Sequence, residues 1–318
     1  MKDMKNIKVL VLEGGNNEEH EVSLATAKEV KNSLLNLNID YEVMNVSPDT
    51  FEKDISKFDS SYICFNALHG TFGEDGKIQK ILEKENFKHT HSGIKASDIS
   101  FDKALTKKAI QYTSILTPKS LTLNYQEIDR KTLFDIFLKF GSFVIKPISS
   151  GSSYGVRIFK NENSIVSFLK DYDDYSKVYQ KHQMLLIEKF IEGRELSVSV
   201  IERDRISYPV EVTEIISNNS FFDYESKYTV GFSRHIVPAQ LPEHIYDKCK
   251  TVAKFVHDKL KCKGISRSDF IYDNNENIFF LEINSQPGLT HTSLLPEQFK
   301  YNGISFDDLI LNLIKCTL

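Results

Sequence analysis

The sequence lacks long apolar runs, large net charge and closely spaced cysteines. No segment reaches the roughly eighteen apolar residues of a membrane span, so we expect no contact with a membrane. A net charge of −4 gives no general attraction to nucleic acid. The four cysteines are scattered without metal-type spacing, which predicts reduced thiols in a cytoplasmic protein.

A signal peptide, internal repeats, low-complexity segments and a Walker A loop are also missing. The first apolar stretch is short and ends in Glu13-Gly14-Gly15, so we expect a strand there instead of a cleaved leader. The apolar content of 41% is ordinary for a globular protein. A chain of 318 residues is too long for one typical core, which predicts two or three α/β subdomains.

The most informative stretch is a predicted hairpin near the end of the chain. Residues 265–272 and 278–283 are rich in β-formers and flank the polar segment 273–277. Because side chains alternate along a strand, a turn in the middle of that segment places Asp269 opposite Glu282. Two facing carboxylates repel each other unless a cation lies between them.

The two faces of this hairpin differ in character. One is expected to carry Arg267, Asp269, Ile271, Phe280, Glu282 and Asn284. The other is expected to be buried through Phe270, Leu281 and Ile283. Carboxylate and amide oxygens suit Mg²⁺ or Mn²⁺, so the first face predicts a metal site. The alternative is a solvated polar face on an exposed hairpin.

The first third of the chain predicts a parallel α/β unit. Its expected strands are residues 8–12, 41–46 and 62–67, and its expected helices are residues 21–37 and 77–85. The Gly-Gly turn after the first strand indicates either a ligand crevice or a structural turn. Glu19 and its acidic neighbours either bind a ligand or act as favourable charges at a helix N-terminus.

Two later loops are rich in glycine or serine. His69 follows the third strand, within a segment that holds three glycines in seven residues. It either handles a proton or hydrogen-bonds a carboxylate, or is satisfied by the backbone. Residues 149–155 offer backbone N–H groups and hydroxyls to phosphate, although a plain hairpin turn has the same composition. The polar residues 222–228 predict a lid.

Hydrophobic periodicity predicts the remaining elements. The expected helices are residues 97–108, 132–140, 243–261 and 306–315. The expected strands are residues 116–121, 143–146, 155–160, 184–190 and 194–201.

Taken in order, these motifs resemble those of the D-alanine–D-alanine ligases of the ATP-grasp superfamily, over nearly the whole chain. The motifs are Glu19-His20-Glu21-Val22-Ser23, Leu68-His69-Gly70, Gly73-Glu74-Asp75-Gly76, Asp102-Lys103, Lys146-Pro147, Gly151-Ser152-Ser153-x-Gly155, Glu188-Lys189-Phe190-Ile191, Lys227-Tyr228, Gly264-x-x-Arg267-x-Asp269 and Glu282-x-Asn284-x-x-Pro287-Gly288. His91 and Lys80 depart from the pattern, because each stands where glycine is common.

The resemblance implies an α/β ATP-grasp fold in three parts. An N-terminal parallel α/β domain would cover residues 1–97, and a central subdomain would cover residues 98–185. A C-terminal subdomain of residues 186–318 would carry the lid and the metal hairpin. ATP would lie between the last two parts, and the protein would be a homodimer.

The resemblance also implies roles for individual residues. The ATP set would be Lys103, Lys146, Ser152, Ser153, Glu188, Lys189, Ile191, Glu195 and Lys227, with Glu188, Lys189 and Ile191 at the adenine edge and Glu195 at the ribose. Two Mg²⁺ or Mn²⁺ ions would bind Asp269, Glu282 and Asn284. The first D-alanine would meet Glu19 and His69, and the second would meet Ser293 and Leu294.

The implied reaction activates one D-alanine as an acyl phosphate, which the amine of the second D-alanine then attacks. Arg267 and the backbone N–H of Gly288 would stabilise the oxyanion. Tyr228 would join Glu19 and Ser152 to latch the lid, or would only pack the loop. The rival interpretations are a carboxylate–amine ligase with other amino-acid substrates and a nucleotide-binding module without catalysis.

Overall fold

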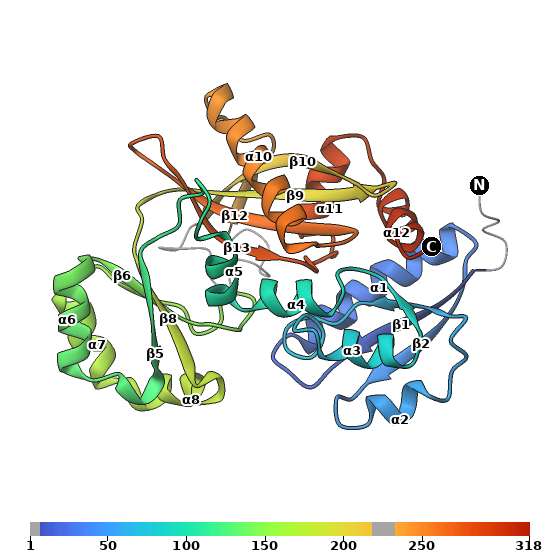
Figure 1. Cartoon of the computed structure of the whole chain (residues 1–318), viewed down its shortest axis with the longest axis horizontal. Helices are drawn as coiled ribbons and strands as arrows, with labels where there is room; N and C mark the ends of the chain where they lie inside the picture. Colours follow the sequence, from blue (N-terminus) through green and yellow to red (C-terminus); the bar gives the residue numbers. More distant parts are fainter. Residues whose placement is uncertain (1–6, 218–232) are drawn as a thin grey trace.

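The structure, a computed structural model, describes residues 7–217 and 233–318. In these ranges the strands form three sheets, which Figure 1 shows as three bodies around the helices α4 (Ile94–Phe101) and α5 (Lys103–Ile110). The first sheet is parallel, and the other two are antiparallel. The mixed α/β class expected from the sequence is confirmed.

The N-terminal sheet has the order β2-β1-β3-β4. Its elements are β1 (Lys8–Gly14), α1 (His20–Asn36), β2 (Asp40–Val46), α2 (Phe51–Ile55), β3 (Ile63–Asn66), α3 (Lys77–Lys84) and β4 (Lys88–His89). Val9 and Val11 pack in the core cluster that contains α1, whereas Leu10 and Leu12 pack in the cluster that contains α2 and α3. Burial on both faces explains why β1 is continuously apolar.

The large antiparallel sheet has the order β11-β10-β9-β12-β13. Its elements are β9 (Gly193–Arg203), β10 (Ile206–Ser217), β11 (Ser233–Ile236), α10 (Glu243–Leu260), β12 (Ile265–Asp273), β13 (Ile278–Asn284), α11 (Leu294–Tyr301) and α12 (Phe306–Lys315). The predicted register is confirmed, since Asp269 pairs with Glu282 and Arg267 pairs with Asn284.

A β-bulge changes the predicted faces of this hairpin. The register shifts after Asp269, so that Phe270 pairs with Phe280, and the two rings make an edge-to-face contact in the core. Phe280 is therefore buried and does not share the face of Glu282, whereas Leu281 lines a cavity beside Glu282. The prediction for Phe280 and Leu281 was wrong because an extra residue in one strand reverses the alternation.

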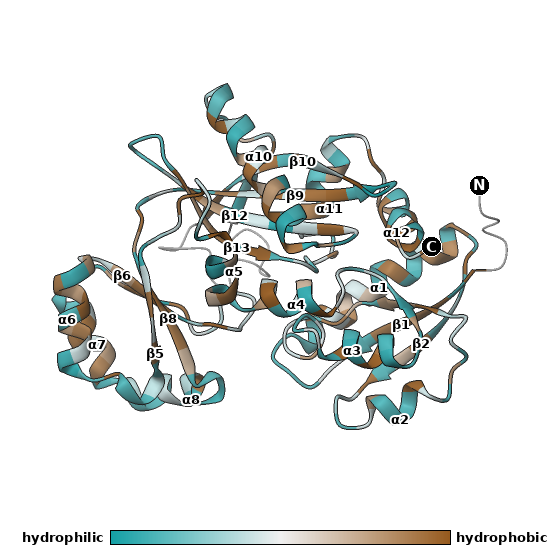
Figure 2. Ribbon diagram, viewed as in Figure 1, coloured by the Kyte–Doolittle hydropathy of each residue, from teal (hydrophilic) through white to brown (hydrophobic). Residues whose placement is uncertain are grey.

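The central sheet has the order β5-β8-β6-β7. Its elements are β5 (Ser120–Asn124), α6 (Arg130–Phe140), β6 (Phe143–Pro147), β7 (Arg157–Phe159), α7 (Glu162–Lys170), α8 (Tyr172–His182) and β8 (Met184–Lys189). The brown inner faces of α6 and α7 in Figure 2 turn toward this sheet. The expected boundary at residue 185 falls inside β8, which pairs with β5 and β6. We propose that the central subdomain continues to Lys189.

The last helix completes the core of the N-terminal unit. Leu309, Ile310 and Leu313 of α12 pack in one cluster with Val9 of β1 and Ile265 of β12. The parallel sheet and the large antiparallel sheet therefore share a core, although their strands lie far apart in the sequence. Figure 1 shows α12 beside α1, at the junction of the two bodies.

Two local predictions need correction. The helix expected over residues 97–108 is two helices, because the backbone of Asp102 is extended and its side chain accepts a hydrogen bond from the N–H of Leu105 to cap α5. The core around α10 takes in Ile110 of α5, so the segment assigned to the central subdomain begins against the large sheet.

His91 has a φ of 67°, which explains why glycine is favoured there. Lys80 is exposed on α3.

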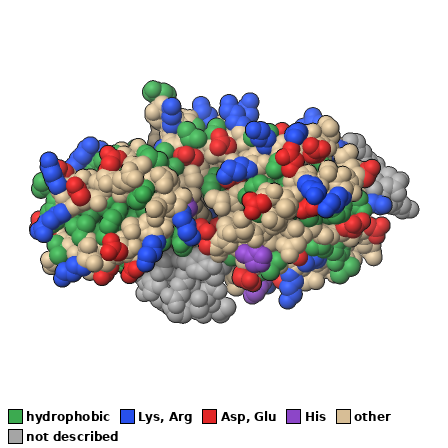
Figure 3. All heavy atoms as spheres, turned by 90° about the horizontal axis from the view of Figure 1, so that it is seen from below, with side chains coloured by type: hydrophobic (Ala, Val, Ile, Leu, Met, Phe, Trp, Pro, Cys, Tyr) green, Lys and Arg blue, Asp and Glu red, His purple; other side chains and the backbone are tan. Residues whose placement is uncertain are grey.

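Positive and negative side chains are interspersed on the face shown in Figure 3. This distribution agrees with the small net charge. Among the described helices, none combines the length and the apolarity needed to cross a membrane.

Candidate active site

A cavity of about 160 Å³ lies between the central sheet and the large sheet. Val144 and Ile158 of the central sheet and Ile271 and Leu281 of the hairpin contribute apolar walls. Its charged lining consists of Lys103, Lys146, Glu188, Lys189, Glu195, Asp269 and Glu282. Two apolar walls with charges at the margin suit a flat ring that carries an anionic tail.

A second, smaller cavity of about 40 Å³ adjoins the first. The two share Lys103, Ser150, Gly151 and Glu282 in their lining. The smaller cavity is lined in addition by Glu74, Phe101, Ser100, Ser152, Arg267, Ile283, Asn284 and Ser285. A ligand in one cavity would therefore contact the same lysine and the same carboxylate as a ligand in the other.

Three buried charges meet at the end of the larger cavity. The carboxylate of Glu188 lies 2.5 Å from the Nζ of Lys146 and 2.5 Å from the Nζ of Lys107. Burial alone would raise the pKa of Glu188, but the two lysines hold it below its usual range. Burial alone would lower the pKa of Lys146, but Glu188 and Glu282 outweigh burial and raise it. These directions favour the charged forms of Glu188 and Lys146.

The hairpin brings the predicted metal ligands together. Asp269 and Glu282 are paired across the strands and both line the larger cavity, and Asn284 lines the smaller one. Arg267 donates from Nε and Nη2 to the two oxygens of Asp269, at 3.0 and 2.8 Å. Ser197 donates to the same carboxylate at 2.7 Å. The face is thus mostly enclosed, which excludes the solvated-hairpin alternative.

The donor set of this face fits a hard divalent cation. It consists of two carboxylates and one amide oxygen, all from adjacent strand positions. The described residues contain no group of three or more histidine, cysteine or acidic side chains around a possible metal position, so Asn284 would be a necessary member of the set. The Nζ of Lys103 lies 3.4 Å from Glu282 and donates to the carbonyl oxygen of Ser150 at 2.7 Å.

Glu19 lies in contact with the serine-rich loop of the central subdomain. It is 5% exposed, stands at the N-cap of α1 and makes no capping hydrogen bond with its side chain. Instead, its Oε1 accepts a hydrogen bond from Ser152. A Cβ added to Gly151 would come 2.5 Å from Oε2 of Glu19, so a side chain at this position would displace the carboxylate. Glu19 therefore contacts the serine-rich loop from the N-terminus of α1, where its charge is also favourable.

His69 is buried and has two side-chain partners. Its Nε2 lies 2.9 Å from the hydroxyl of Thr26, and its Nδ1 lies 3.0 Å from Glu74. The backbone-satisfied alternative is therefore wrong for this histidine. Glu74 lines the smaller cavity and also accepts a hydrogen bond from the N–H of Gly70. His69 thus orients a carboxylate at the edge of that cavity.

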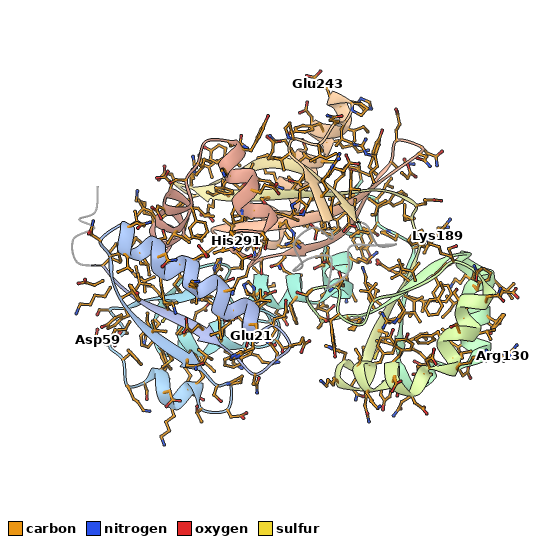
Figure 4. The ribbon with its side chains drawn as sticks, turned by 180° about the vertical axis from the view of Figure 1, so that it is seen from behind. Glu21, Asp59, Arg130, Lys189, Glu243 and His291 are labelled. Carbon is orange, nitrogen blue, oxygen red and sulfur yellow. The ribbon has the colours of Figure 1, made fainter. Side chains whose placement is uncertain are left out.

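The remaining predicted residues divide between the two ends of the site. Ser153, Ile191 and Glu195 line the larger cavity together with Lys189, which Figure 4 shows at the margin of the central subdomain. Gly288 approaches Ser293, the residue before the first turn of α11, and Leu294 is buried in that turn. Their connecting loop contains His291, which Figure 4 shows near α1.

Lys227 and Tyr228 lie outside the described residues, as does the whole predicted lid over residues 222–228.

Three residues that contribute to the site were not assigned a role from the sequence: Lys107, Glu74 and Ser150. Lys107 follows Lys103 by four positions on α5, and this helical spacing is the signal that places both on one face. Glu74 belongs to the glycine-rich segment after β3, whereas nothing distinguishes Ser150 from its serine neighbours.

Comparisons with known proteins agree with this geometry. A family model described as "D-ala D-ala ligase C-terminus" matches residues 111–315. The D-alanine–D-alanine ligase of Pelagibacter ubique is 38% identical over 312 residues, covering 97% of each chain. The enzyme of the same name from Zymomonas mobilis is 38% identical and covers 96% of this chain and 92% of its own.

Solved structures give the same result. The crystal structure of D-alanine–D-alanine ligase from Bacillus anthracis, complexed with ATP, has a TM-score of 0.78 at 27% identity and covers 98% of this chain and 96% of its own. The VanG D-Ala:D-Ser ligase of Enterococcus faecalis has a TM-score of 0.78 at 25% identity, covering 99% and 100%. Because the family model and the relatives together span nearly the whole sequence, the chain belongs to the D-alanine–D-alanine ligases, ADP-forming enzymes that join two D-alanines with ATP for peptidoglycan synthesis.

Proposed function

We propose that this ligase forms D-alanyl-D-alanine through a D-alanyl phosphate intermediate, with ATP in the larger cavity and the amino acids in the smaller one. The observation that carries the proposal is the shared lining of the two cavities by Lys103 and Glu282. A carboxylate in the smaller cavity would lie next to a terminal phosphate in the larger, as transfer of a phosphoryl group requires.

We propose that the nucleotide is held by the residues named from the sequence. The apolar walls would enclose adenine, with Glu188, Lys189 and Ile191 at its edge and Glu195 at the ribose. Lys103 and Lys146 would neutralise the phosphates, and Ser152 and Ser153 would cover them. The φ angles of these serines, 50° and 57°, are sterically unfavourable, as is common for residues that hold a ligand.

Asp269, Glu282 and Asn284 would hold two Mg²⁺ or Mn²⁺ ions, whose positive charge would stabilise the transferring phosphoryl group. The facing positions of Asp269 and Glu282 support this proposal, because each carboxylate is held by a cationic side chain, Arg267 or Lys103, whose place a metal ion could take. Arg267 would then be released toward the reacting carbonyl group.

The chemistry follows from the poor reactivity of a carboxylate as an acyl donor. A carboxylate oxygen of the first D-alanine attacks the γ-phosphorus, and ADP leaves with the electrons of the broken P–O bond. The amine of the second D-alanine then attacks the acyl carbon, and phosphate leaves as the peptide bond forms and the nitrogen loses its protons. Arg267 and the N–H of Gly288 would stabilise the tetrahedral oxyanion.

The two amino acids would meet at the smaller cavity and extend beyond its lining toward the residues named for them from the sequence. Glu19 would pair with the ammonium of the first D-alanine, and His69 would orient Glu74 beside its carboxylate. Ser293 and Leu294 would bind the carboxylate of the second D-alanine, where the N-terminus of α11 favours an anion. Glu19 and His69 adjoin the smaller cavity through Ser152 and Glu74, which line it, whereas Ser293 and Leu294 lie beyond its lining.

Tyr228 would latch a lid over the acyl phosphate, so that water is excluded while the amine attacks. We therefore expect D-alanine to be preferred over D-lactate as acceptor at neutral pH, and Tyr228→Phe to raise ATP hydrolysis that is not coupled to dipeptide. The protein would act in the cytoplasm as a homodimer.

The test is a product assay by mass spectrometry with ATP, Mg²⁺ and D-alanine, in which phosphate is counted per dipeptide formed. D-lactate and D-serine compete at equal concentration in parallel reactions, because a structural relative is named a D-Ala:D-Ser ligase. We expect D-alanyl-D-alanine with one phosphate per dipeptide. Dominant D-alanyl-D-lactate or D-alanyl-D-serine would contradict the proposed acceptor, and phosphate release without D-alanine would contradict ligation.

A further inference from the structure

Lys107 is the one lysine of the buried charge cluster that does not line the nucleotide cavity. It lies on α5, is 9% exposed, and contacts Glu188 without belonging to the cavity lining. Its Nζ lies 2.5 Å from Oε1 of Glu188, whereas Lys146 contacts Oε2 at 2.5 Å. The two oxygens of one carboxylate are therefore held by two different cations, only one of which faces the ligand.

A second contact fixes the position of Lys107. Its Nζ donates to the carbonyl oxygen of Pro118 at 2.9 Å, and the side chain of Pro118 belongs to the lining of the same cavity. Burial lowers the pKa of Lys107, although Glu188 opposes this shift. A buried ammonium is retained only where hydrogen bonds and an anion offset its desolvation, and Lys107 has both.

Lys146 and Lys107 have different charged surroundings. Lys146 is at the end of β6, inside the cavity, and lies in the field of Glu282 and Asp269 as well as Glu188. Polyphosphate in the cavity would attract Lys146 and weaken its hold on Glu188. A carboxylate that is 3% exposed would then be left without a counter-ion unless a second cation stayed behind it.

We propose that Lys107 is that permanent counter-ion: a positioning residue that keeps Glu188 ionised and oriented as the acceptor for the 6-amino group of adenine. This inference rests on the proposed placement of adenine at Glu188. Lys107 acts through Glu188 and does not touch the nucleotide. It thereby makes the enzyme selective for a purine that carries an amino group at this position over one that carries a carbonyl oxygen.

The experiment measures binding of ATP and of inosine triphosphate by isothermal titration calorimetry, with Mg²⁺ and without D-alanine. Inosine triphosphate differs from ATP by a carbonyl oxygen in place of the 6-amino group. Lys107→Met is expected to weaken ATP binding about tenfold, within the range for a lost charged hydrogen bond, and to change inosine triphosphate binding less than about threefold. Lys107→Gln keeps a donor for Pro118 but removes the charge. It is expected to show the same loss of preference for ATP over inosine triphosphate.

Lys108→Met is the matched control, because Lys108 is the exposed neighbour of Lys107 on the same helix. A double-mutant cycle with Glu188→Gln distinguishes positioning from general damage. In the Glu188→Gln background, Lys107→Gln should cost less than about twofold in ATP affinity, since the group through which it acts is already neutral. Thermal unfolding of each variant establishes that it is folded.

Three outcomes would overturn the inference. They are equal losses of ATP and inosine triphosphate affinity in Lys107→Gln, an unchanged ATP affinity in that variant, and a full additional loss in the Glu188→Gln background. The steady-state assay with D-alanine gives a further readout, because a positioning role raises KM for ATP while kcat stays within about threefold. Failure of the proposed ligation itself would appear in the wild-type enzyme, as ATP binding without D-alanine-dependent ADP formation.

Discussion

The central subdomain and the rest of the molecule are built in opposite ways. Among the described residues, the core of the central subdomain draws on the segment between Leu121 and Ile187 alone. The core beneath the N-terminal sheet draws on residues from Val9 to Ile314 and includes both sheets of that body. We call this second body the shared-core body.

The difference indicates which parts of the site move together. Glu19, His69 and the metal hairpin all stand on elements of the shared-core body, in which Ile265 of the hairpin strand β12 packs in the same core as β1, α1 and β3. Lys146, Ser152 and Glu188 stand on the central subdomain, which meets that body through ion pairs and hydrogen bonds around the cavities. Polar contacts across a ligand cavity are more readily exchanged than a packed core, so the central subdomain is the part expected to open for ATP.

The largest expected effect on turnover comes from substitutions in the metal hairpin, which remove a proposed metal ligand and leave both cores intact. Asp269→Asn or Glu282→Gln should lower turnover about a thousandfold or more, since each removes a charged ligand for cations worth several kcal/mol to the transition state. Turnover is measured by D-alanine-dependent ADP release across a Mg²⁺ titration, and the fold by circular dichroism. Glu276→Gln, in the exposed turn of the same hairpin, is the matched control. Near wild-type turnover with an unchanged Mg²⁺ requirement would refute the metal assignment.

Because the two bodies have separate cores, a substitution that creates a cavity in one core should destabilise mainly that body. Phe168→Ala should cost about 3–5 kcal/mol, and Leu313→Ala should cost about 2–5 kcal/mol. Hydrogen exchange measured by mass spectrometry should show the first change accelerating exchange within residues 120–189, because Phe168 belongs to the central core. The second should accelerate exchange in both β1 and β12, because Leu313 packs in the shared core. Equal acceleration throughout the chain in Phe168→Ala would show that the two bodies unfold as one.

Arg267→Ala, a substitution in the shared-core body, is expected to affect turnover and ATP affinity to different extents. Loss of one oxyanion donor costs about 3–4 kcal/mol in the barrier, so turnover should fall far more than ATP affinity, which depends mainly on the central subdomain. Single-turnover kinetics and ATP titration measure the two quantities. Arg267→Lys, which keeps the charge but not the two-pronged contact with Asp269, should recover only part of the turnover. Weakened ATP binding with unaltered turnover would make Arg267 a nucleotide clamp instead.

The smallest expected effect is a loss of folding stability as the pH falls. Burial lowers the pKa of His91 to about 3 and that of His257 to about 4, and both lie in the shared-core body. An unfolded histidine binds its proton near pH 6.5, so the unfolded state takes up more protons between that pH and the folded pKa. Each histidine should therefore add about 1.4 kcal/mol per pH unit to the loss of stability as pH falls through this range.

The measurement is urea unfolding between pH 7.5 and 5, with His91→Gly as the comparison. This variant removes one titrating group and relieves the unfavourable φ of 67°. It should reduce the slope by about half of the two-histidine contribution. An unchanged slope would mean that His91 is protonated in the folded protein.

The sequence predicted those parts of the fold whose pattern is local. The hairpin register followed from alternation and a polar turn, and α12 was predicted with the bounds that the structure gives it. The bulge beside Asp269 was not predicted, because an extra residue in a strand leaves the apolar composition unchanged. The strand β10 and the helices α7 and α8 were missed, since mixed polar and aromatic residues obscure their periods.

The site followed the same rule. Asp269 and Glu188, which belong to recognisable motifs, line the larger cavity, and Glu19 contacts Ser152, while the roles proposed for them stay predictions. Lys107 was missed because its role depends on Glu188, eighty-one positions later, and on Pro118, which only folding brings beside it. The four-residue spacing places Lys107 on the same helix face as Lys103, but it does not indicate the contacts with Glu188 and Pro118.

The shared core also sets an order on biosynthesis. A ribosome releases the chain from its N-terminus, so residues of β1 and α1 emerge long before Leu309 and Leu313 of α12 can cover them. The first sheet must therefore wait, partly uncovered, while the self-contained central subdomain is free to fold. A premature stop a few residues before α12 would leave the N-terminal apolar surface exposed, and such surface is what chaperones and proteases recognise.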